Sequence, residues 1–378
     1  MTFHIGAIKM NIREKVEEFA ERYIATRSDL HTMEGFPFDL WEKMGEEGLL
    51  GVGIAEEFGG LGGDHLTLSA AGEALVRSGH NLGIAVSWLL HQMVARFIMR
   101  FGAESQRMQY LKDLASGKIT GCFAVSEPGR GAHPKNLSTA ARREGAMYIL
   151  DGEKTYLTNG PIAGLFLVVA VTETTGARKS FTAFIAPRDT PGLSLTEPIA
   201  FPFLRPSPHG GIVLQNAALP AAAILGESGR AYDDMVLPFR ELEDALMMGP
   251  AVGGMASQMQ SLVRLARDQQ VARTEIIEND LGRLQSLLDT LRLIASRAAQ
   301  LLDIEDAGHS ESVSLMLAFR SLAAEYQAVL SGVVTKTGIE SDDRLSWMTR
   351  DLTATSQIAG NVARIKQQKL GAALLAAG

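Results

Sequence analysis

The first third of the chain has the apolar spacing of amphipathic helices. In the segments IREKVEEFAERYI and FDLWEKMGEEGLL, apolar residues recur three and four positions apart, as they do on one face of an α-helix. The stretch from Leu66 to Phe101 is rich enough in Ala, Leu and Met to be buried on most sides. The pattern predicts helices from Asn11 to about Gly117, interrupted by the glycine-rich GGLGG at residues 59–63.

From about Ile119 the pattern changes to short apolar runs that contain β-branched and aromatic residues. The runs CFAV, MYIL, FLVVAVT, FTAFIA, LSLT and GIVLQN are separated by turn signals such as EPGRG, DGEK, RDTPG and SPHGG, which is typical of strands joined by turns. Because no helical segment intervenes, we expect an antiparallel sheet or barrel rather than a parallel sheet. This β unit should end near Leu225 and Gly226.

The helical period returns at Asp233 and continues toward the end of the chain. Two apolar stripes predict long helices with short connections, which typically form a four-helix bundle. The stripes are also wide enough for subunit contacts. They consist of Leu281, Leu284, Leu287, Leu288, Leu291, Ile294, Ala295 and Ala298, and of Leu315, Phe319, Leu322, Tyr326 and Leu330.

The pattern therefore predicts an α+β multidomain protein with three parts. An N-terminal helical domain over residues 1–118 is followed by a middle β domain over residues 119–230, a β-barrel or sandwich. A C-terminal four-helix-bundle domain covers residues 231–378.

Composition and charge exclude several classes of protein. Of the 378 residues, 46% are hydrophobic, which is enough for sizeable cores. The formal net charge of -7 argues against a nucleic-acid partner, which would require clustered Lys and Arg. The single cysteine, Cys122, lies in an apolar run and is expected to be a buried small side chain rather than a reactive thiol.

The sequence contains none of the usual targeting or metal-binding patterns. We read no signal peptide and no membrane span of about 18 apolar residues, and one cysteine fits a reducing compartment, so a cytoplasmic protein is expected. No HExxH or CxxC pattern and no Walker A loop occurs, so no metal site is predicted. Neither GGLGG nor GPAVGG follows a strand and opens a βαβ unit, which argues against a Rossmann domain.

Four separated strings resemble, in sequence and in order, those of acyl-CoA dehydrogenases. They are EEFGGLGG, RFGAESQRMQYLKDLASGKITGCFAVSEPGRG, YILDGEKTYLTNG (taken as a hairpin) and SPHGGIVLQNAALPAAAILGESGRAYDDM. The resemblance covers roughly residues 45–260, and the string TSQI extends it into the C-terminal helices.

The resemblance implies a chemistry and a set of partners. Proteins of this family hold FAD noncovalently and oxidise the α–β carbon bond of an acyl thioester. A base removes the α proton, donors polarise the thioester carbonyl, and flavin N5 receives the β hydride. An electron-transfer flavoprotein-like acceptor and a homodimer or homotetramer are implied as well.

The same resemblance assigns flavin contacts in the β domain. Phe123, Val125 and Ser126 stand where the family lines the isoalloxazine ring and its pyrimidine edge. Tyr156, Leu157 and Thr158 stand at a motif that is usually Trp-Ile-Thr, whose aromatic residue packs by the ring and whose Thr hydroxyl approaches N5. Ordinary strand pairing is the alternative for all six residues.

Two further segments are expected to contact phosphates or substrate. The family's Gly-x-Gly-Ser-Asp turn is here Gly129-Arg130-Gly131-Ala132-His133, so the glycines Gly129 and Gly131 remain but Ala132 lacks the serine's hydroxyl. Arg130 could pair with a phosphate and His133 could donate to a ligand; solvated loop side chains are the alternative. Thr355, Ser356 and Gln357 resemble the segment that meets the flavin diphosphate, where a helix start would suit an anion; a helix N-cap without a ligand is the alternative.

The position of the catalytic base departs from the usual pattern of the family. Its common glutamate, two residues before the Thr-Ser-Gln string, is replaced by Thr353, which is not basic. A minority of the family places the base on the first helix after the β domain, where Glu243 falls. The alternative is an acidic helix start. Glu241 matches an acidic position near CoA. Asp244 replaces a common arginine, which weakens the case for CoA and leaves an acyl group on a carrier protein, or a different substrate, as alternatives.

In relatives, residues of the bundle bind the FAD of the neighbouring subunit. Arg273 and Gln285 stand near two such positions, but Ile276-Ile277 replaces the Phe-Gly pair, and the family's glycine-rich loop has no equivalent. The leading hypothesis is an FAD-dependent oxidoreductase that forms an α,β double bond in an acyl thioester. A catalytically silent binding or partner subunit, and a flavin oxidase or monooxygenase of the same fold, are the alternatives.

Overall fold

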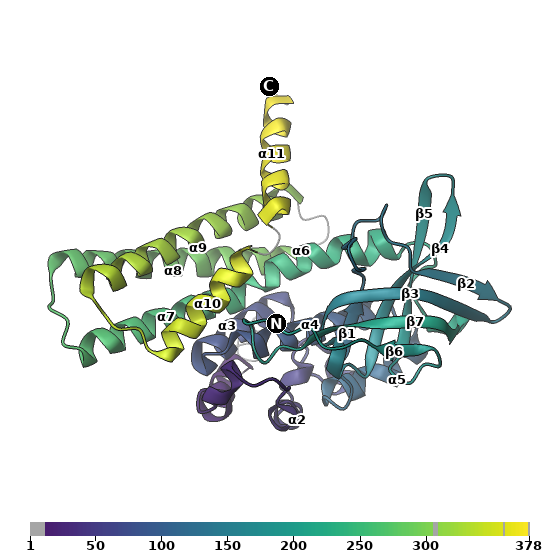
Figure 1. Ribbon diagram of the computed structural model, residues 1–378, viewed down its shortest axis with the longest axis horizontal. Coiled ribbons are helices and arrows are strands. Elements are labelled where there is room, and N and C mark those ends of the chain that lie inside the picture. Colours follow the sequence, from purple (N-terminus) through teal and green to yellow (C-terminus); the bar gives the residue numbers. More distant parts are fainter. Residues whose placement is uncertain (1–11, 305–308, 358–359, 377–378) are drawn as a thin grey trace, which may run out of the picture. The chain divides into compact units, whose positions relative to one another are not determined.

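The computed structural model describes residues 12–304, 309–357 and 360–376 (Figure 1). The chain divides into two compact units, each built from separated segments. A helical unit contains residues 1–31, 64–85 and 243–378, and a β-containing unit contains residues 32–63 and 86–242. The strands begin at Gly121, and helical structure returns at Tyr232. The three-domain division along the sequence stays a prediction.

The helical unit is built around four packed helices. These are α7 (Met248–Asp268), α8 (Glu275–Leu301), α9 (His309–Thr337) and α10 (Asp343–Gln357), which confirm the predicted bundle (Figure 1). Helix α3 (His65–Gly79) packs along α7. Residues 12–19 and the π-helical turn Ala20–Ile24 complete the N-terminal segment, and α11 (Gly360–Ala376) ends the described chain.

The predicted apolar stripes form much of the interior of this bundle. On α8, Leu284 and Leu291 are fully buried, and on α9 Tyr326 is fully buried. The Tyr326 hydroxyl donates a hydrogen bond to the carbonyl oxygen of Met255, at 2.8 Å, so its polar end is satisfied inside the core. The helical spacing therefore predicted the buried faces correctly.

Two glycines of α7 permit its close approach to α3. A Cβ atom added at Gly249 would clash with the carbonyl oxygen of Ser69, and one added at Gly253 would clash with that of Glu73. Neither obstacle is the movable end of a side chain, because both oxygens belong to the helical backbone. These positions therefore require glycine for packing.

Replacing Gly249 by alanine should destabilise the helical unit by about 1–3 kcal/mol, the usual cost of overpacking. Gly282 on α8 is the matched control, because an added Cβ meets nothing within 4 Å there. Gly282→Ala should instead raise stability by roughly 0.5–1 kcal/mol through helix propensity. Thermal and denaturant unfolding measure both effects, and equal effects at the two positions would contradict the packing role of Gly249.

The β-containing unit holds one eight-stranded sheet with the strand order β6-β7-β3-β2-β4-β5-β8, in which β1 also pairs with β4. The longer strands are β3 (Met147–Thr158), β4 (Leu165–Thr175), β5 (Arg178–Pro187) and β7 (His209–Pro220). The shorter ones are β1 (Gly121–Ala124), β2 (Ala140–Glu144), β6 (Leu193–Leu195) and β8 (Ile224–Leu225).

The sheet confirms the α+β fold class, but it is mixed rather than purely antiparallel. Strand β4 is parallel to β1 and to β2, and the other pairings are antiparallel. A parallel pair needs a long connection, and the segment with the β2–β3 hairpin supplies it between β1 and β4. Strand β2, AARRE, was missed because its residues are mostly exposed and polar.

The expected hairpin within YILDGEKTYLTNG is wrong, because residues 148–158 belong to the single strand β3. The DGEK segment contains a register shift against β7 between Leu150 and Gly152. At Gly152 φ is 149°, and an added Cβ would lie 2.6 Å from Thr139 Oγ1. The glycine that resembled a turn signal therefore permits a bulge within the strand.

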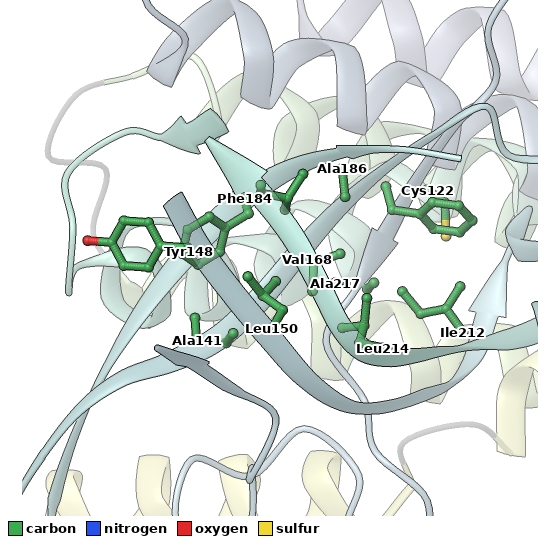
Figure 2. Close-up of a cluster of buried hydrophobic side chains, with 14 of the residues drawn as sticks. Cys122, Ala141, Tyr148, Leu150, Val168, Phe184, Ala186, Ile212, Leu214 and Ala217 are labelled. Atoms are coloured by element: carbon green, nitrogen blue, oxygen red, sulfur yellow. The ribbon is translucent and has the colours of Figure 1, made fainter. Parts of the chain in front are cut away.

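The sheet encloses one hydrophobic core, whose side chains point toward one another in Figure 2. Cys122 and Phe184 are fully buried there, and the core continues through Leu150 and Ile212. Burial raises the pKa of the Cys122 thiol, which agrees with the predicted inert side chain. Helices α2 (Phe38–Glu46) and α5 (Glu104–Ala115) also belong to this unit.

Helix α4 (Leu82–Phe101) is long and apolar enough to cross a membrane by length and composition. However, 83% of its apolar 18-residue stretch is buried inside the protein. Core helices of soluble proteins pass the same test, so α4 is weak evidence for a membrane span.

Candidate functional site

Tyr156 is the most unusual residue of the β-containing unit. It lies in a second register shift between β3 and β7, between Lys154 and Leu157. Its φ is 57°, in the left-handed region, which an L-residue occupies at a cost of about 1–2 kcal/mol. Its side chain is 62% exposed, whereas Leu157 and Lys154 are buried. The bulge therefore turns a large aromatic ring out of the strand.

Thr158, two residues further along β3, faces β7. It lies opposite His209 in the strand register, and its Oγ1 is 3.1 Å from His209 Nε2. His209 Nδ1 lies 3.1 Å from the carbonyl oxygen of Ser207. Strand pairing thus brings together a hydroxyl and an imidazole that are about fifty positions apart in the sequence.

The end of β1 lies beside the Tyr156 bulge. The Ser126 carbonyl accepts a hydrogen bond from Thr155 N at 2.9 Å, and the Val125 carbonyl accepts one from Lys154 Nζ at 2.9 Å. The structure therefore brings the two predicted flavin-contact segments, 123–126 and 156–158, next to each other. Their contact with a flavin stays a prediction.

Phe123 differs from Tyr156 because its ring is buried. The ring centroids of Phe97 and Phe239 lie 5.3 Å and 4.7 Å from that of Phe123. Aromatic pairs at such separations stabilise a core. Phe123 thus belongs to an aromatic cluster within this unit, in keeping with the ordinary-strand alternative for its side chain.

A buried ion pair between Glu127 and Lys154 anchors the segment after β1. Lys154 Nζ lies 3.0 Å from Glu127 Oε1, and the two side chains are 0% and 3% exposed. The carboxylate also accepts hydrogen bonds from the backbone N–H and hydroxyl groups of Ser138 and Thr139, at 2.7–2.9 Å. Every oxygen of this buried charge is therefore satisfied.

The electrostatics of this pair explain why both groups stay charged. Burial alone would raise the pKa of Glu127, but the charge of Lys154 and hydrogen bonds from Thr139 and Lys154 outweigh burial and lower the pKa to about 2. Burial lowers the pKa of Lys154 to about 8, against the opposing effect of Glu127. The sequence analysis did not predict the pair. Lys154 is nevertheless an even number of residues from the buried Tyr148 and Leu150, so the alternation of side chains along β3 directs it inward.

The glycine loop after Glu127 is a tight turn. Gly129 and Gly131 have φ values of 68° and 61°, and a Cβ added at either meets nothing within 4 Å. The backbone N–H of Gly131 donates to the Glu127 carbonyl, and that of Glu127 donates to the Gly131 carbonyl, both at 3.1 Å. The predicted substrate contacts Gly131 and Ala132 therefore lie on a loop whose backbone is open to a ligand.

Side chains of this loop make local contacts. Arg130 donates to the carbonyl oxygen of Asn136 at 3.3 Å, and His133 Nδ1 accepts from the backbone N–H of Lys135 at 3.3 Å. The hydroxyl of Tyr232 donates to the Ala132 carbonyl at 3.3 Å. These contacts agree with the simpler interpretation of Arg130 and His133 as loop side chains.

The anion site expected at Thr355, Ser356 and Gln357 is contradicted by the helix position. These residues end α10 rather than begin a helix, so the partial charge of the backbone there is negative. Thr355 Oγ1 donates to the Leu352 carbonyl at 2.9 Å, and Ser356 Oγ donates to the Thr353 carbonyl at 2.7 Å. The TSQI string is too short to show on which side of a helix boundary it lies.

Thr353 and Asp351 occupy different faces of α10. Thr353 is exposed, whereas Asp351 is fully buried and pairs with Arg350 Nε at 2.8 Å. Two residues on a helix are separated by about 200° of rotation, so Asp351 does not take the place of Thr353. The replacement of the family's usual base by Thr353 stays a prediction.

Glu243, the predicted base, is exposed on α6 (Leu237–Leu246). A π-helical turn, Tyr232–Val236, precedes α6, and α7 begins at Met248. The acidic group thus lies late in α6, and the helix-start interpretation of Glu241, Glu243 and Asp244 is wrong. The role of Glu243 as the base stays a prediction.

The neighbours of Glu243 are half-buried. Asp244 Oδ2 lies 3.1 Å from Lys366 Nζ of α11, a partner that sequence reasoning missed. Glu241, like Asp244, is partly covered.

Within the described ranges, no group of three or more His, Cys, Asp or Glu side chains could hold a metal ion.

Arg273 and Gln285, predicted to contact a neighbouring subunit's FAD, are both exposed. Arg273 precedes α8, and Gln285 lies on α8 with its amide donating to Asp289 Oδ1 at 3.0 Å. Gln285 lies about 15 Å along α8 from its first residue, Glu275, at 1.5 Å per residue. Arg273 and Gln285 do not form one cluster within this chain.

Comparison with known proteins agrees with this architecture. Butyryl-CoA dehydrogenase from Megasphaera elsdenii superimposes with a TM-score of 0.84 at 22% identity, covering 97% of this chain and 98% of that chain. The prolyl acyl carrier protein oxidase AnaB gives a TM-score of 0.84 at 26% identity, with the same coverage. A probable acyl-CoA dehydrogenase, YngJ of Bacillus subtilis (strain 168), is 30% identical over 309 residues, 80% of this chain and 81% of YngJ.

The fold and these relatives define a class, the acyl-CoA dehydrogenase-type flavoprotein oxidoreductases. Residues 9–118 match the family described as "Acyl-CoA dehydrogenase, N-terminal domain", and residues 122–217 match "Acyl-CoA dehydrogenase, middle domain". The chain belongs to the acyl-CoA dehydrogenase family, whose cofactor is FAD.

Proposed function

We propose that this protein uses FAD to form an α,β double bond in an acyl thioester. The observation that carries the proposal is the bulge that holds Tyr156 exposed, in a left-handed conformation, two residues before the Thr158 hydroxyl. Strained residues persist where the surrounding fold imposes them, often at ligand sites. Together with family membership, this geometry supports a flavin-binding wall.

The residues around the bulge fit a flavin. Tyr156 offers an aromatic face, Thr158 offers a hydroxyl, and the loop at Gly129 and Gly131 has room for close backbone approach. Bound FAD would accept the hydride that leaves the β carbon. Within this chain, Tyr156 would pack by the ring, Thr158 would hydrogen-bond to it, and Glu243 would take the α proton.

The thioester carrier is part of the proposal. Asp244 stands where relatives have an arginine near CoA, and Lys366 pairs with it. AnaB, by its description, is an oxidase of a prolyl acyl carrier protein. Both observations support a carrier-protein thioester over CoA.

Two other functions have specific support. A flavin oxidase is favoured by the likeness to AnaB, and it would consume oxygen without an added electron acceptor. A catalytically silent partner subunit is favoured by Thr353, by Ala132 and by the loss of the family's glycine-rich loop.

The remaining partners and the location belong to the same proposal. An electron-transfer flavoprotein-like acceptor and a homodimer or homotetramer follow from the family resemblance. A cytoplasmic location is supported by the single cysteine, Cys122, which is buried and unpaired with another cysteine.

Purified protein should be yellow or take up FAD on titration, and it should bleach anaerobically with an acyl thioester. Tyr156→Ala should weaken FAD binding by about tenfold or more. The stacking of a nucleobase on an aromatic side chain contributes about 1–3 kcal/mol to binding, and we expect a similar contribution from the flavin ring on Tyr156. Tyr110→Ala, which removes a half-buried tyrosine on α5, is the control. A protein that takes up no FAD would exclude both the dehydrogenase and the oxidase and support the silent subunit.

A further inference from the structure

His209 is held in one orientation by contacts on three sides. Its backbone is fixed opposite Thr158 by the β3–β7 register, and its carbonyl oxygen accepts from Ile199 N at 2.8 Å. The ring of Phe201 meets the imidazole edge-on, with centroids 5.1 Å apart and planes at 85°. An imidazole packed in this way cannot rotate freely, so its two nitrogens keep distinct partners.

The partners of the two nitrogens determine where the ring proton lies. Nδ1 faces the Ser207 carbonyl at 3.1 Å, and a carbonyl oxygen can only accept, so Nδ1 carries a hydrogen. Burial lowers the pKa of His209, more than the bond to Ser207 raises it, which favours the neutral ring. In a neutral imidazole with a hydrogen on Nδ1, Nε2 is an acceptor.

The hydroxyl of Thr158 is then fixed as well. Since Nε2 accepts, the hydroxyl at 3.1 Å must donate its single hydrogen to His209. Its lone pairs remain directed away from that bond. To any further group, Thr158 therefore presents an acceptor and not a donor.

We propose that His209 is a positioning residue that fixes the Thr158 hydroxyl as a hydrogen-bond acceptor for an N–H group of the ligand. This inference rests on the proposed function, in which that ligand is FAD. Flavin N5 carries a hydrogen in the reduced form and a bare lone pair in the oxidised form. An acceptor-only Thr158 therefore binds reduced FAD more tightly than oxidised FAD and raises the reduction potential.

The first test requires no flavin. The chain has eight histidines, so protein labelled with ¹⁵N in the imidazole ring gives few signals, and the His209 signal disappears in His209→Phe. Long-range proton–nitrogen correlation at neutral pH should show hydrogen on Nδ1 and a bare Nε2. Thr158→Val, which keeps the side-chain shape, should shift the Nε2 signal. Hydrogen on Nε2 would overturn the proposal.

The second test measures the FAD midpoint potential by dye equilibration. Thr158→Val and His209→Phe should each lower the potential by about 30 mV, which corresponds to a tenfold change in a two-electron equilibrium. The double variant should show no further decrease, because His209 acts through Thr158. Thr172→Val is the matched control: it removes a threonine hydroxyl of β4 that lies 2.9 Å from Thr182 Oγ1, and it should leave the potential unchanged.

The outcomes separate this inference from the function on which it rests. Additive decreases in the double variant, or an unchanged potential in His209→Phe, would overturn the positioning role while FAD binding stands. Failure to take up FAD would overturn the proposed function and the flavin part of the inference. In that case the nitrogen spectra still decide whether Thr158 is held as an acceptor.

Discussion

Replacing Glu243 by glutamine should lower turnover of an acyl thioester by about 10²–10⁴-fold, the usual contribution of a general base. Glutamine keeps the shape of the side chain but cannot accept the α proton. FAD content and the absorption spectrum should be unchanged, because Glu243 is not among the proposed flavin contacts. Anaerobic bleaching in a stopped-flow spectrophotometer measures the step directly.

A matched carboxylate distinguishes base catalysis from a general loss of charge. Asp233 is exposed in the π-helical turn that precedes α6, and Asp233→Asn should leave bleaching unchanged. If Glu243→Gln bleaches as fast as the wild type, Glu243 is not the base. Loss of FAD from the same variant would instead place Glu243 in cofactor binding.

Replacing Lys154 by methionine should destabilise the β-containing unit by about 3–5 kcal/mol, the cost of leaving a buried charge without its partner. Glu127 would keep its hydrogen bonds from Ser138 and Thr139 but lose the cation at 3.0 Å. Denaturant unfolding followed by far-UV circular dichroism measures the loss. Arg142→Met, which breaks an exposed pair with Glu144, should cost less than about 1 kcal/mol.

A double variant and a pH series test the same pair. Adding Glu127→Gln to Lys154→Met should recover much of the stability, because an amide oxygen still accepts from the backbone without a buried charge. The folded-state pKa of Glu127, about 2, lies below its ordinary value of 4.5. Its contribution is therefore complete above about pH 4.5 and is lost as the pH falls toward 2. Additive losses in the double variant would contradict the coupling.

Much of the fold could be predicted from local patterns. The helical spacing of Leu284 and Leu291 located a buried face, and the apolar runs around Phe166 and Phe184 located central strands. Helices and buried strands repeat over many residues, so their periods appear within a short window of sequence. The order of these elements, with the four matching strings, was sufficient for the family.

The site depended on contacts between distant residues. A short string cannot show whether Gly152 makes a turn or a bulge, because that depends on the partner strand β7 and on Thr139. The same reason explains the error at Thr355. The position of α10 along the chain, and not the residue types, decides whether Thr355 lies at the positive or the negative end of a helix dipole.

The sequence by itself determined the fold class, the family and the chemical types of the residues at the expected flavin wall. Only the tertiary structure decided that Tyr156 is turned outward, that Lys154 neutralises Glu127, and that His209 faces Thr158. Periodicity is a local property of the chain, whereas strand register and charge pairing are long-range. They are settled only when segments far apart in the sequence pack together.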